Sequence, residues 1–599
     1  MDADIRQGEA IGGPYAVTGT LPSLADVTAF TDGSARFDVG YYRFVSHPHL
    51  RRVESILKDT YRCRHCRLAE SPEIALLELL LCLRAPGAPA RVVVLKDTDA
   101  SAPIADESFF APGDREGLTV LVHGPSPSPA PELGRGDILI LVPRTGSPVP
   151  RSLAEQARRA SDAGASAILY GEFPPDRPTD VPGARYHVVG LRAEHPSGCP
   201  AVRAGAVLGS SDKVMSRLAL LMRRRGPILS SRAAEWLLGG RGSTDGNGAG
   251  GGRGNPAGAV QRVADVLIER EAGTGAFLYA SGMSAITRVL DVLRVPGKSQ
   301  VVAVGYLFND TYKGLQLAPR RAHEAPNRFL GVDEVGMLDD AVLDETAAIL
   351  TETITNPLGD VPDLAELSRI ARRHGVPLVV DNTMATPENC RPLELGADIV
   401  IHSTTKYLNG RNDHGGGAVI VRGSREAALL AERQARWSDG MSPLEAAVLE
   451  GNLATLPERM RRFNANAARV ASMIAAHPGA GRLWFNGHPS HRSYATARRV
   501  LKGTGSVISF TLARDTREGL EAFYDSALAG IRKAPSLGSD ATLLCPYTLL
   551  THFEDTDEAL AAAGLPRFLV RIAVGCEETI DPVLESLDDA FRRSLAGPA

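Results

Sequence analysis

The chain is poor in cysteine, with seven among its 599 residues. So few cysteines in so long a chain do not form a disulfide framework. Cys63 and Cys66 make one CxxC pair around His65, but neither a second CxxC nor a close histidine pair completes a zinc site. We therefore interpret the cysteines as ordinary thiols of a reducing compartment and expect no metal site.

Long apolar runs and a strong excess of either charge are also missing. No apolar run approaches the roughly 18 residues of a membrane span, and the start MDADIRQGEAIGGPY has no basic segment followed by an apolar core. The net charge is −4, and the 66 basic residues are scattered along the chain. We predict a cytoplasmic protein that binds small molecules or protein, with no membrane and no nucleic-acid partner.

The length and the pattern of the middle part predict several domains around an α/β sheet. A chain of 599 residues exceeds the size at which one hydrophobic core stops growing. Short β-rich runs alternate with a segment of helical period: AAILTET, DLAELSRIARRHG, VPLVVDNT, ADIVIHST and AVIV. This alternation is typical of parallel βαβ units and predicts a doubly wound sheet. Residues 239–258 are mostly glycine and small polar residues, so we expect a mobile loop there.

One lysine stands between hydroxyl side chains and glycines in IHSTTKYLNGRNDHGGGAVIV, which begins at Ile401. Lys406 comes just after the apolar run ADIVI, where a buried strand would end. Ser403 and Thr405 would then face a common point near the carboxyl end of that strand, where open α/β sheets form their ligand crevice. Because hydroxyls suit an anion and a lysine suits a carbonyl, the stretch predicts a site for a phosphorylated aldehyde.

Two other stretches favour pyridoxal phosphate as that aldehyde. Asp381 follows VPLVV, so its carboxylate would lie at a strand end, in line to meet the protonated ring nitrogen that lets a pyridoxal ring accept electrons. In FLYASGMSAITRVL, the backbone amides of Gly282 and Met283 would open a helix and bind the phosphate. Packing explains a glycine at such a turn more often than phosphate binding does, so the prediction depends on the combination.

These motifs resemble the cystathionine γ-synthase and γ-lyase family of pyridoxal phosphate enzymes, also called the Cys/Met metabolism family. VVDNTMATP and IHSTTKYLNGRNDHGGGAV carry the resemblance, and LFNDTY, TETITNPLGDVPDL, APSLGSDATLLCPYTLLTH and LVRIAVGCEE extend it over residues 260 to 590. It implies the aspartate aminotransferase-like fold type I, with a mostly parallel central sheet and a smaller C-terminal α+β domain.

The resemblance implies a role for each matching residue. Lys406 would form the Schiff base with the cofactor, and Asp381 would hold the ring nitrogen. The other expected cofactor contacts are Gly282, Met283, Ser403 and Thr405 at the phosphate, Thr383 beside the ring, and Asn356 at the ring hydroxyl and the substrate. Arg571 matches the arginine that binds the substrate carboxylate, assisted by Ser536, because its planar fork meets a carboxylate through two hydrogen bonds.

The chain departs from the family at two aromatic positions. Phe308 stands where the family has a tyrosine that stacks on the ring, so it can stack but cannot donate or accept a proton. The family's Tyr-x-Arg, which reaches the neighbouring subunit's phosphate, is missing before Asn-Pro, where only Arg253 remains. Tyr41 and Arg43 form a Tyr-x-Arg far upstream, so we predict that they bind this phosphate and that Tyr41 is catalytic. An ordinary helix with an aromatic staple is the alternative.

An insertion separates this N-terminal arm from the rest. GRGDILILVPRTGSPVPRSLAEQARRASDAGASAILYGEF, from Gly134, runs strand, helix, strand and resembles a protease-associated (PA) domain, a β-rich module; an inert insertion is the alternative. We expect an arm with the first helices over 1–90, a PA-like domain over 91–225, the PLP-binding large domain over 226–430 and a small domain over 431–599. Family members complete their sites across a dimer interface, so a homodimer or homotetramer is expected.

The resemblance implies chemistry at the γ carbon of an amino acid. Lys406 would remove the Cα proton and then a Cβ proton, after which loss of a leaving group from Cγ leads to γ-elimination or γ-replacement. Relatives that use cystathionine commonly have Glu before Ser-Leu-Gly, but here Pro535 leaves a distal ammonium unpaired, at a cost of ~1 to 3 kcal/mol. We predict a substrate with an O-acyl, thioether or halogen leaving group at C4 and a place in specialised amino-acid metabolism. The alternatives are cystathionine γ-synthase or γ-lyase proper and a degenerate scaffold that contacts partners through the insert.

Overall fold

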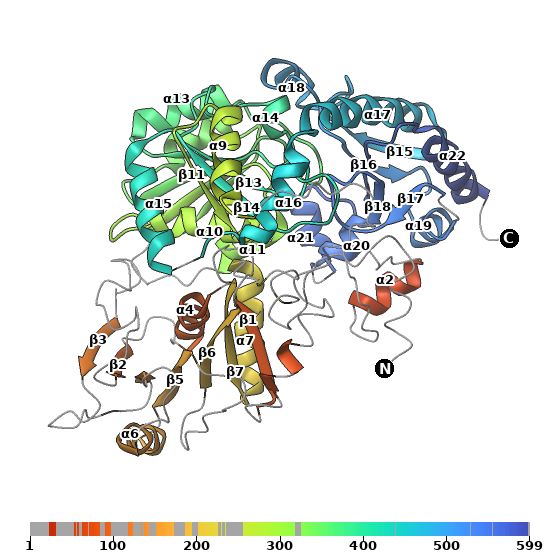
Figure 1. Ribbon diagram of the computed structural model, residues 1–599. Helices are drawn as coiled ribbons and strands as arrows, with labels where there is room; N and C mark the ends of the chain where they lie inside the picture. The colour runs from red at the N-terminus through yellow and green to blue at the C-terminus, as the bar shows by residue number, and fades with distance from the viewer. Residues whose placement is uncertain are drawn as a thin grey trace.

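The computed structural model describes most of the chain after residue 256 and selected parts before it. The described ranges are 23–31, 63–69, 71–83, 90–96, 118–123, 137–142, 151–163, 165–172, 186–193, 202–225, 256–317, 325–437, 439–526, 529–553 and 555–596, with a few single residues and short pieces between 53 and 234. Three sheets organise these residues, and Figure 1 shows them as three neighbouring units.

The central sheet has seven strands in the order β10-β9-β11-β12-β13-β14-β8. Its strands are β8 (Gly275–Tyr279), β9 (Gln300–Val304), β10 (Arg328–Leu330), β11 (Thr346–Glu352), β12 (Leu378–Asp381), β13 (Ile399–Ser403) and β14 (Gly417–Val421). Strands β10 through β13 run parallel, whereas β14 and β8 are antiparallel to their neighbours. The predicted mostly parallel sheet is therefore confirmed.

Helices cover both faces of this sheet. They are α9 (Ala259–Glu271), α10 (Gly282–Leu293), α11 (Asn309–Leu317), α13 (Leu364–His374) and α15 (Ser424–Trp437), with the short elements η3 (Val335–Met337), α12 (Leu338–Ala341) and α14 (Thr386–Asn389). Helix α13 begins where the Asp363 side chain accepts from the Glu366 amide and ends at Gly375, whose φ of 62° suits glycine. Its buried Leu364, Leu367 and Ile370 lie on one face, as the helical period predicts.

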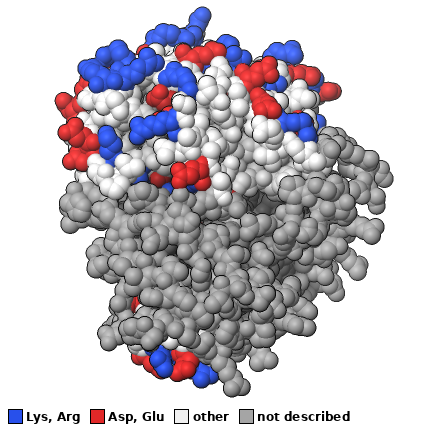
Figure 2. Space-filling model, turned by 60° about the vertical axis from the view of Figure 1, so that its left-hand side comes forward, with Lys and Arg blue, Asp and Glu red and all other residues white. Residues whose placement is uncertain are grey.

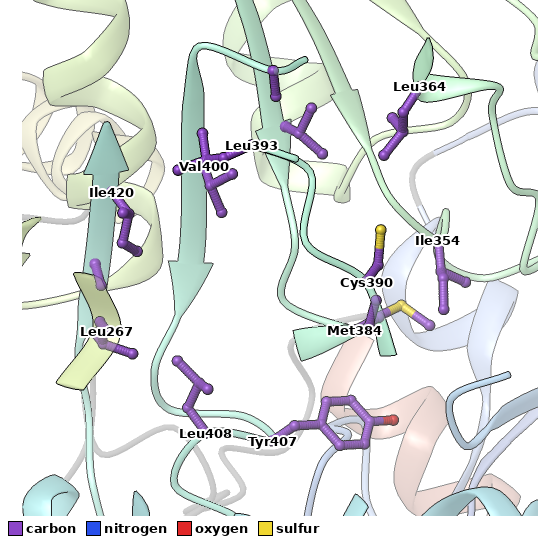
Figure 3. Packing of buried hydrophobic residues seen from close by; sticks show 14 of the residues in the cluster. Leu267, Ile354, Leu364, Met384, Cys390, Leu393, Val400, Tyr407, Leu408 and Ile420 are labelled. Atoms are coloured by element: carbon purple, nitrogen blue, oxygen red, sulfur yellow. The ribbon is translucent and has the colours of Figure 1, made fainter. Parts of the chain in front are cut away.

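The core of the central unit reaches the carboxyl end of β13. In Figure 3, Val400 of β13 and Ile420 of β14 lie above Tyr407 and Leu408, which come directly after Lys406. Tyr407 is fully buried, and its hydroxyl is 2.9 Å from the Ser506 hydroxyl. Packed side chains on both sides of a residue restrict its backbone, so this core holds the segment after β13 in one position.

The C-terminal unit is an α+β domain, as predicted. Its sheet has the order β15-β16-β19-β18-β17, formed by β15 (Ala480–Trp484), β16 (Val507–Leu512), β17 (Ile531–Lys533), β18 (Thr542–Pro546) and β19 (Val570–Ala573). Its helices, with α16 leading into them, are α16 (Pro443–Leu453), α17 (Leu456–Ala476), α18 (Tyr494–Val500), α19 (Arg517–Tyr524), α20 (Tyr547–Thr551), α21 (Asp557–Ala562) and α22 (Asp581–Ala596). Helix α2 (Leu24–Thr31), far away in sequence, packs Leu24 and Val27 into the same core.

The N-terminal unit is a third sheet, in the order β1-β7-β6-β5-β4-β2-β3. Its strands are β1 (His65–Ala69), β2 (Ala90–Lys96), β3 (Leu118–His123), β4 (Ile138–Val142), β5 (Ser166–Glu172), β6 (Tyr186–Ala193) and β7 (Val202–Gly209), and its helices are α4 (Pro72–Leu83), α6 (Arg151–Asp162) and α7 (Asp212–Arg225).

Two predicted domain boundaries do not coincide with these units. The boundary at residue 90 falls inside the N-terminal sheet, because β1 pairs with β7 along its whole length. The boundary at 430 falls inside α15. The strand, helix, strand order from Gly134 is present as β4, α6 and β5, but parallel strands with helices build the unit, so a separate β-rich insert over 91–225 is not what the structure contains.

Both signs of charge mix on the described surface. Figure 2 shows Lys and Arg beside Asp and Glu on this face. Within the part of the chain that the structure describes, no helix combines the length and apolar character that crossing a membrane requires. Cys66 of the CxxC pair is buried in β1, and burial raises the pKa of its thiol.

Candidate functional site

The predicted cofactor lysine lies in a turn directly after β13. The Lys406 amide donates to the Ser403 carbonyl oxygen at 3.2 Å, and the Lys406 Nζ donates to the Ser536 Oγ at 2.7 Å. Arg459 stabilises the turn, because its Nη1 donates to the Tyr407 carbonyl oxygen at 2.7 Å. The side chain of Lys406 therefore points from the central sheet towards the loop before β18 of the C-terminal unit.

A glycine lets that loop approach the lysine closely. Gly538, in the segment Ser536-Leu537-Gly538, has a φ of +71°, which side chains other than glycine rarely adopt. A Cβ atom at this position would lie 2.5 Å from the Tyr407 amide nitrogen and 2.8 Å from the Lys406 carbonyl carbon. The backbone contact between the two units thus depends on the absence of a side chain here.

Asp381 ends β12, the strand beside β13, as predicted. Its Oδ1 accepts from the Thr383 amide at 2.9 Å, and burial raises the pKa of its carboxyl group. Glu352 is its register partner on β11, and burial together with the charge of Asp381 raises the pKa of Glu352 well above its usual value. A buried carboxylate needs a cationic partner to stay ionised, and a protonated pyridine nitrogen would be one.

The predicted phosphate site lies where α10 begins beside the end of β13. The Ser281 side chain caps α10 by accepting from the Ser284 amide at 3.0 Å. A Cβ atom on Gly282 would lie 2.7 Å from the Ser403 Cβ, so only glycine leaves room there. The Thr383 Oγ1 accepts from the Ser403 amide at 2.7 Å and fixes that residue. Free amides at a helix start, beside a serine hydroxyl, suit a phosphate group.

Other predicted cofactor residues flank this site. Met283 follows Gly282 on α10, and the Thr311 Oγ1 lies 3.6 Å from its sulfur. Thr405 engages its hydroxyl with Gly416, donating to the carbonyl oxygen and accepting from the amide. A lysine, a buried carboxylate and an anion cradle at the ends of adjacent strands fit the parts of pyridoxal phosphate: its aldehyde, ring nitrogen and phosphate.

Arg571 of β19 completes the site from the C-terminal unit. Its Nη1 donates to the Asn356 Oδ1 at 3.0 Å, and its Nη2 donates to the carbonyl oxygens of Pro535 and Ser536. The guanidinium also lies 4.9 Å from the centre of the Tyr547 ring, whose hydroxyl accepts from the Asn356 Nδ2 at 3.2 Å. Predicted substrate residues from three distant stretches therefore meet, and Tyr547 is a member that the motifs did not reveal.

A chain of three polar side chains lies beside Tyr547. The Tyr306 hydroxyl is 3.1 Å from the His552 Nε2, and the His552 Nδ1 is 2.7 Å from the Asp555 Oδ2. The rings of His552 and Tyr547 lie 5.7 Å apart. Burial raises the pKa of Tyr306 and lowers the pKa of His552. No sequence motif revealed this Tyr-His-Asp group, because Tyr306 and His552 are 246 residues apart. Of its three members, only His552 lies in a motif quoted above, at the end of APSLGSDATLLCPYTLLTH.

Phe308 lies two residues after Tyr306, at the start of α11. Its backbone amide donates to the Glu352 carboxylate, which places the residue at the carboxyl end of the sheet near Asp381. The neighbouring Asn309 donates through Nδ2 to the Thr551 carbonyl oxygen at 2.8 Å and so holds the start of α11 against α20. The backbone at Phe308 is therefore fixed beside the strand ends that carry Glu352 and its register partner Asp381.

Buried polar groups support the strand ends from behind. The His402 Nε2 lies 2.7 Å from the Glu271 Oε1, which also accepts from the Asn382 Nδ2 at 2.8 Å. His402 and Asn382 are the sequence neighbours of Ser403 and Asp381, and all three side chains of this network are fully buried. Hydrogen bonds between buried side chains restrict their orientation, so the contacts of Glu271 with His402 and Asn382 help to orient the two strand ends.

The remaining predicted residues lie outside the described part of the chain. Tyr41, Arg43 and Arg253 belong to this group. Within the described residues, no cluster of three or more histidine, cysteine, aspartate or glutamate side chains has a geometry that could hold a metal ion.

Comparisons with known proteins agree with this geometry. The sequence profile of the family described as Cys/Met metabolism PLP-dependent enzyme matches residues 252–592. The chain is 34% identical to the cystathionine gamma-synthase of Escherichia coli over 353 residues, which is 58% of this chain and 88% of that protein. It is also 34% identical to the L-methionine gamma-lyase of Pseudomonas putida, over 55% of this chain and 81% of that protein.

A solved structure shows the same similarity. The crystal structure of cystathionine gamma synthase from Xanthomonas oryzae pv. oryzae in complex with cystathionine matches with a TM-score of 0.53 and 31% identity. The match covers 57% of this chain and 87% of that one.

Proposed function

The chain belongs to the Cys/Met metabolism family of PLP-dependent enzymes, and we propose that it catalyses γ-elimination or γ-replacement on an amino acid with a leaving group at C4. One observation carries the proposal. The loop that accepts a hydrogen bond from Lys406 through Ser536 Oγ also accepts two from Arg571 through the carbonyl oxygens of Pro535 and Ser536. A substrate carboxylate held by Arg571 would therefore bring its α carbon beside the lysine.

Each residue then has a defined task. When bound, the cofactor supplies an electron sink for negative charge that develops at the substrate α carbon. Lys406 moves protons at Cα and Cβ through its Nζ, and Asp381 would hold the ring nitrogen in its protonated form. The amides of Gly282 and Met283 and the Ser403 side chain would hold the cofactor phosphate, with Thr405 and Thr383 supporting them. Asn356 orients Arg571, and Phe308 would pack against the cofactor ring.

Tyr306 transfers the proton to the departing group or from the entering group. Asp555 accepts from the His552 Nδ1–H, so the His552 Nε2 is free to accept the Tyr306 hydroxyl proton. An entering thiol or alcohol gives its proton to the Tyr306 oxygen while the Tyr306 proton moves to His552, whose positive charge Asp555 then balances. Protonation of a leaving group runs in the opposite direction. This route replaces the hydroxyl that Phe308 lacks.

The substrate differs from cystathionine in this proposal. Pro535 stands where an acid would meet a distal ammonium group, and its carbonyl oxygen is already used by Arg571. An O-acyl, thioether or halogen leaving group without a distal ammonium suits such a site better. Cystathionine γ-synthase or γ-lyase activity proper is the alternative, since relatives carry those names. The contacts among Lys406, Ser536 and Arg571 argue against a degenerate scaffold.

In this proposal Tyr41 and Arg43 bind the cofactor phosphate, with Arg253 as the alternative. The protein forms a homodimer or homotetramer. It works in the cytoplasm, where free thiols and amino-acid substrates are present.

Exchange of substrate protons with solvent tests the reaction class. A substrate analogue with an unreactive γ carbon, such as norvaline, is incubated with the holoenzyme in deuterium oxide and followed by NMR. We expect deuterium at both Cα and Cβ, because departure of a γ group requires removal of a Cβ proton. Exchange at Cα alone would contradict γ chemistry, and no exchange would contradict the assignment of Lys406.

A further inference from the structure

The N-terminal sheet and the central sheet have the same topology. Written from the first strand of each, the orders are β1-β7-β6-β5-β4-β2-β3 and β8-β14-β13-β12-β11-β9-β10. Both sheets therefore have the same order when the seven strands of each unit are numbered along the sequence: first, seventh, sixth, fifth, fourth, second, third. The strand directions also agree at every pair. In each sheet the seventh strand, β7 or β14, is antiparallel to both of its neighbours, and all other neighbouring strands are parallel.

The elements also repeat along the sequence with little change in spacing. Strands β1 and β8 begin at residues 65 and 275, helices α4 and α10 at 72 and 282, strands β2 and β9 at 90 and 300, and strands β3 and β10 at 118 and 328. One offset of 210 residues, the difference within each pair, relates all four. Helices α4 and α10 both have 12 residues, and α7 and α15 both have 14.

Local sequence agrees with this correspondence. Ser71 caps α4 by accepting from the Ile74 amide, just as Ser281 caps α10 by accepting from the Ser284 amide. The sequence GAV occurs in both seventh strands, at Gly205 and Gly417, and these glycines pair with corresponding strand positions. VPRSLAE at Val149 and VPDLAE at Val361 lead into α6 and α13.

The ladders identify the counterparts of the cofactor residues. Asp381 pairs with Ile401 of β13, which pairs with Val419; in the N-terminal sheet Tyr170 pairs with Val188 of β6, which pairs with Val207. Tyr170 thus stands at the position of Asp381. Ser403 pairs with Gly417 as Gly190 pairs with Gly205. Ala193 follows Gly190 by three residues, as Lys406 follows Ser403, but β6 continues as a strand to Ala193 whereas β13 ends at Ser403. At these two described positions the N-terminal unit therefore has a tyrosine and an alanine in place of the aspartate and the lysine that cofactor chemistry requires.

Equivalent helices of the two units face each other. Figure 1 shows α4 and α7 beneath the central unit, and α7 contacts α10 and α11. Arg225, the last residue of α7, donates to the Asp291 Oδ2 of α10 at 2.9 Å and to the Glu78 Oε1 of α4 at 2.8 Å. Trp437, the last residue of α15, accepts from the Ser71 Oγ at 2.8 Å and packs in the core around α4 and α7. Each copy therefore inserts the end of the same helix against the other copy's first helix, as in a twofold interface.

We infer that residues 65–225 are a degenerate second copy of the cofactor domain, and that this copy occupies, within the same chain, the face that a partner subunit's cofactor domain would cover. The chain is an internal pseudo-dimer with one cofactor site. Any association between whole chains uses a face other than the one formed by α10 and α15.

Isotope-mixed cross-linking tests the arrangement without using catalysis. The variant Arg225→Lys keeps the charge and brings an amine to Asp291, so a zero-length carbodiimide reagent can join the two side chains as an amide. Chains made with ordinary and heavy nitrogen are mixed under conditions that exchange subunits, cross-linked, digested and analysed by mass spectrometry. We expect linked 225–291 peptides in which both halves carry the same isotope.

The matched control is Arg217→Lys, on the exposed side of the same helix. It should give no link to Asp291. Linked peptides that combine both isotopes would show that the interface forms between chains, and absence of any 225–291 link in the folded variant would show that the interface does not exist. Cofactor content gives a separate check, with one cofactor per chain expected and its borohydride-fixed adduct only on the Lys406 peptide. An adduct in residues 65–225 would contradict the loss of the second site.

Discussion

Burial determines what the strand-end carboxylate can do at the scale of a single residue. Burial raises the pKa of Asp381, so the group stays ionised only when a cation faces it. Asp381→Asn should still bind cofactor but should slow exchange of the substrate Cα proton by at least ~10²-fold, because a neutral amide cannot keep the ring nitrogen charged. NMR in deuterium oxide measures this rate, and exchange at the wild-type rate would refute the assignment.

Lys406 is expected to be essential for turnover but not for cofactor binding. The cradle at Gly282 and Ser403 does not include the lysine, so Lys406→Ala should hold the cofactor without a covalent bond and lose all measurable activity. Borohydride treatment followed by mass spectrometry should find an adduct on the wild-type peptide alone. Normal turnover by the variant would contradict the role of this residue.

The hydrogen-bonded side chains Tyr306, His552 and Asp555 should determine how kcat depends on pH at the acid end of the range. Burial lowers the pKa of His552 below the usual 6.5. The titratable groups around it are those of Asp555, Lys313, Tyr306 and Tyr547. Only neutral His552 can accept the Tyr306 proton, so kcat for γ-replacement should fall as pH drops through this lowered pKa. Tyr306→Phe should lower kcat by ~10²- to 10⁴-fold and abolish this dependence.

Tyr312→Phe is the matched control for that variant. The Tyr312 ring stacks on the Tyr306 ring with 5.7 Å between their centres, but Tyr312 is not one of the three hydrogen-bonded side chains Tyr306, His552 and Asp555. The kcat and the pH profile of Tyr312→Phe should therefore match those of the wild type. Cα exchange should be normal in both variants, which separates failure of the proton route from failure of the cofactor chemistry. An unchanged pH profile in Tyr306→Phe would exclude the route.

At the scale of elements, the close approach of the Ser536-Gly538 loop to the lysine turn joins the two units of the site. Gly538 and Gly564 both have positive φ, but only Gly538 has backbone atoms within reach of an added Cβ. Gly538→Ala and Gly564→Ala should each cost ~1 kcal/mol or more in stability from backbone strain. Only Gly538→Ala should also raise KM and lower kcat, because it displaces Ser536 and the Arg571 contact. Equal kinetic effects in both variants would show that the approach is unimportant.

At the scale of the whole molecule, the internal copy changes where the arm residues act. Tyr41 and Arg43 precede the degenerate copy, whereas the matching position before the intact copy keeps only Arg253. In a twofold pair each arm serves the other copy, and only the intact copy has a phosphate to bind. Mixing Lys406→Ala chains with Arg43→Ala chains should therefore restore no activity, since no chain of either kind has both residues. Recovered activity in hybrids would place the arm on a neighbouring chain.

Local chemistry determined the parts of the site that the sequence alone predicted. Short apolar runs precede four residues of the site: Gly282, Asp381, Ser403 and Lys406. Because the patterns that mark strands and helices are local properties of the sequence, these runs placed the four residues near strand ends. The parallel sheet and the cofactor followed from these patterns, whereas the γ-carbon chemistry was implied by the family resemblance of the motifs.

Contacts between distant segments decided the rest. Tyr306 meets His552 across two units, and β1 pairs with β7 from the far end of the same unit, although no local pattern specifies either partner. The segment from Gly134 shows its strands and helix in sequence, but a short strand, helix, strand pattern is shared by many folds. Only the complete strand order identified that unit as a second copy of the cofactor domain, because topology depends on which strands pair, and pairing is settled by packing of the whole core.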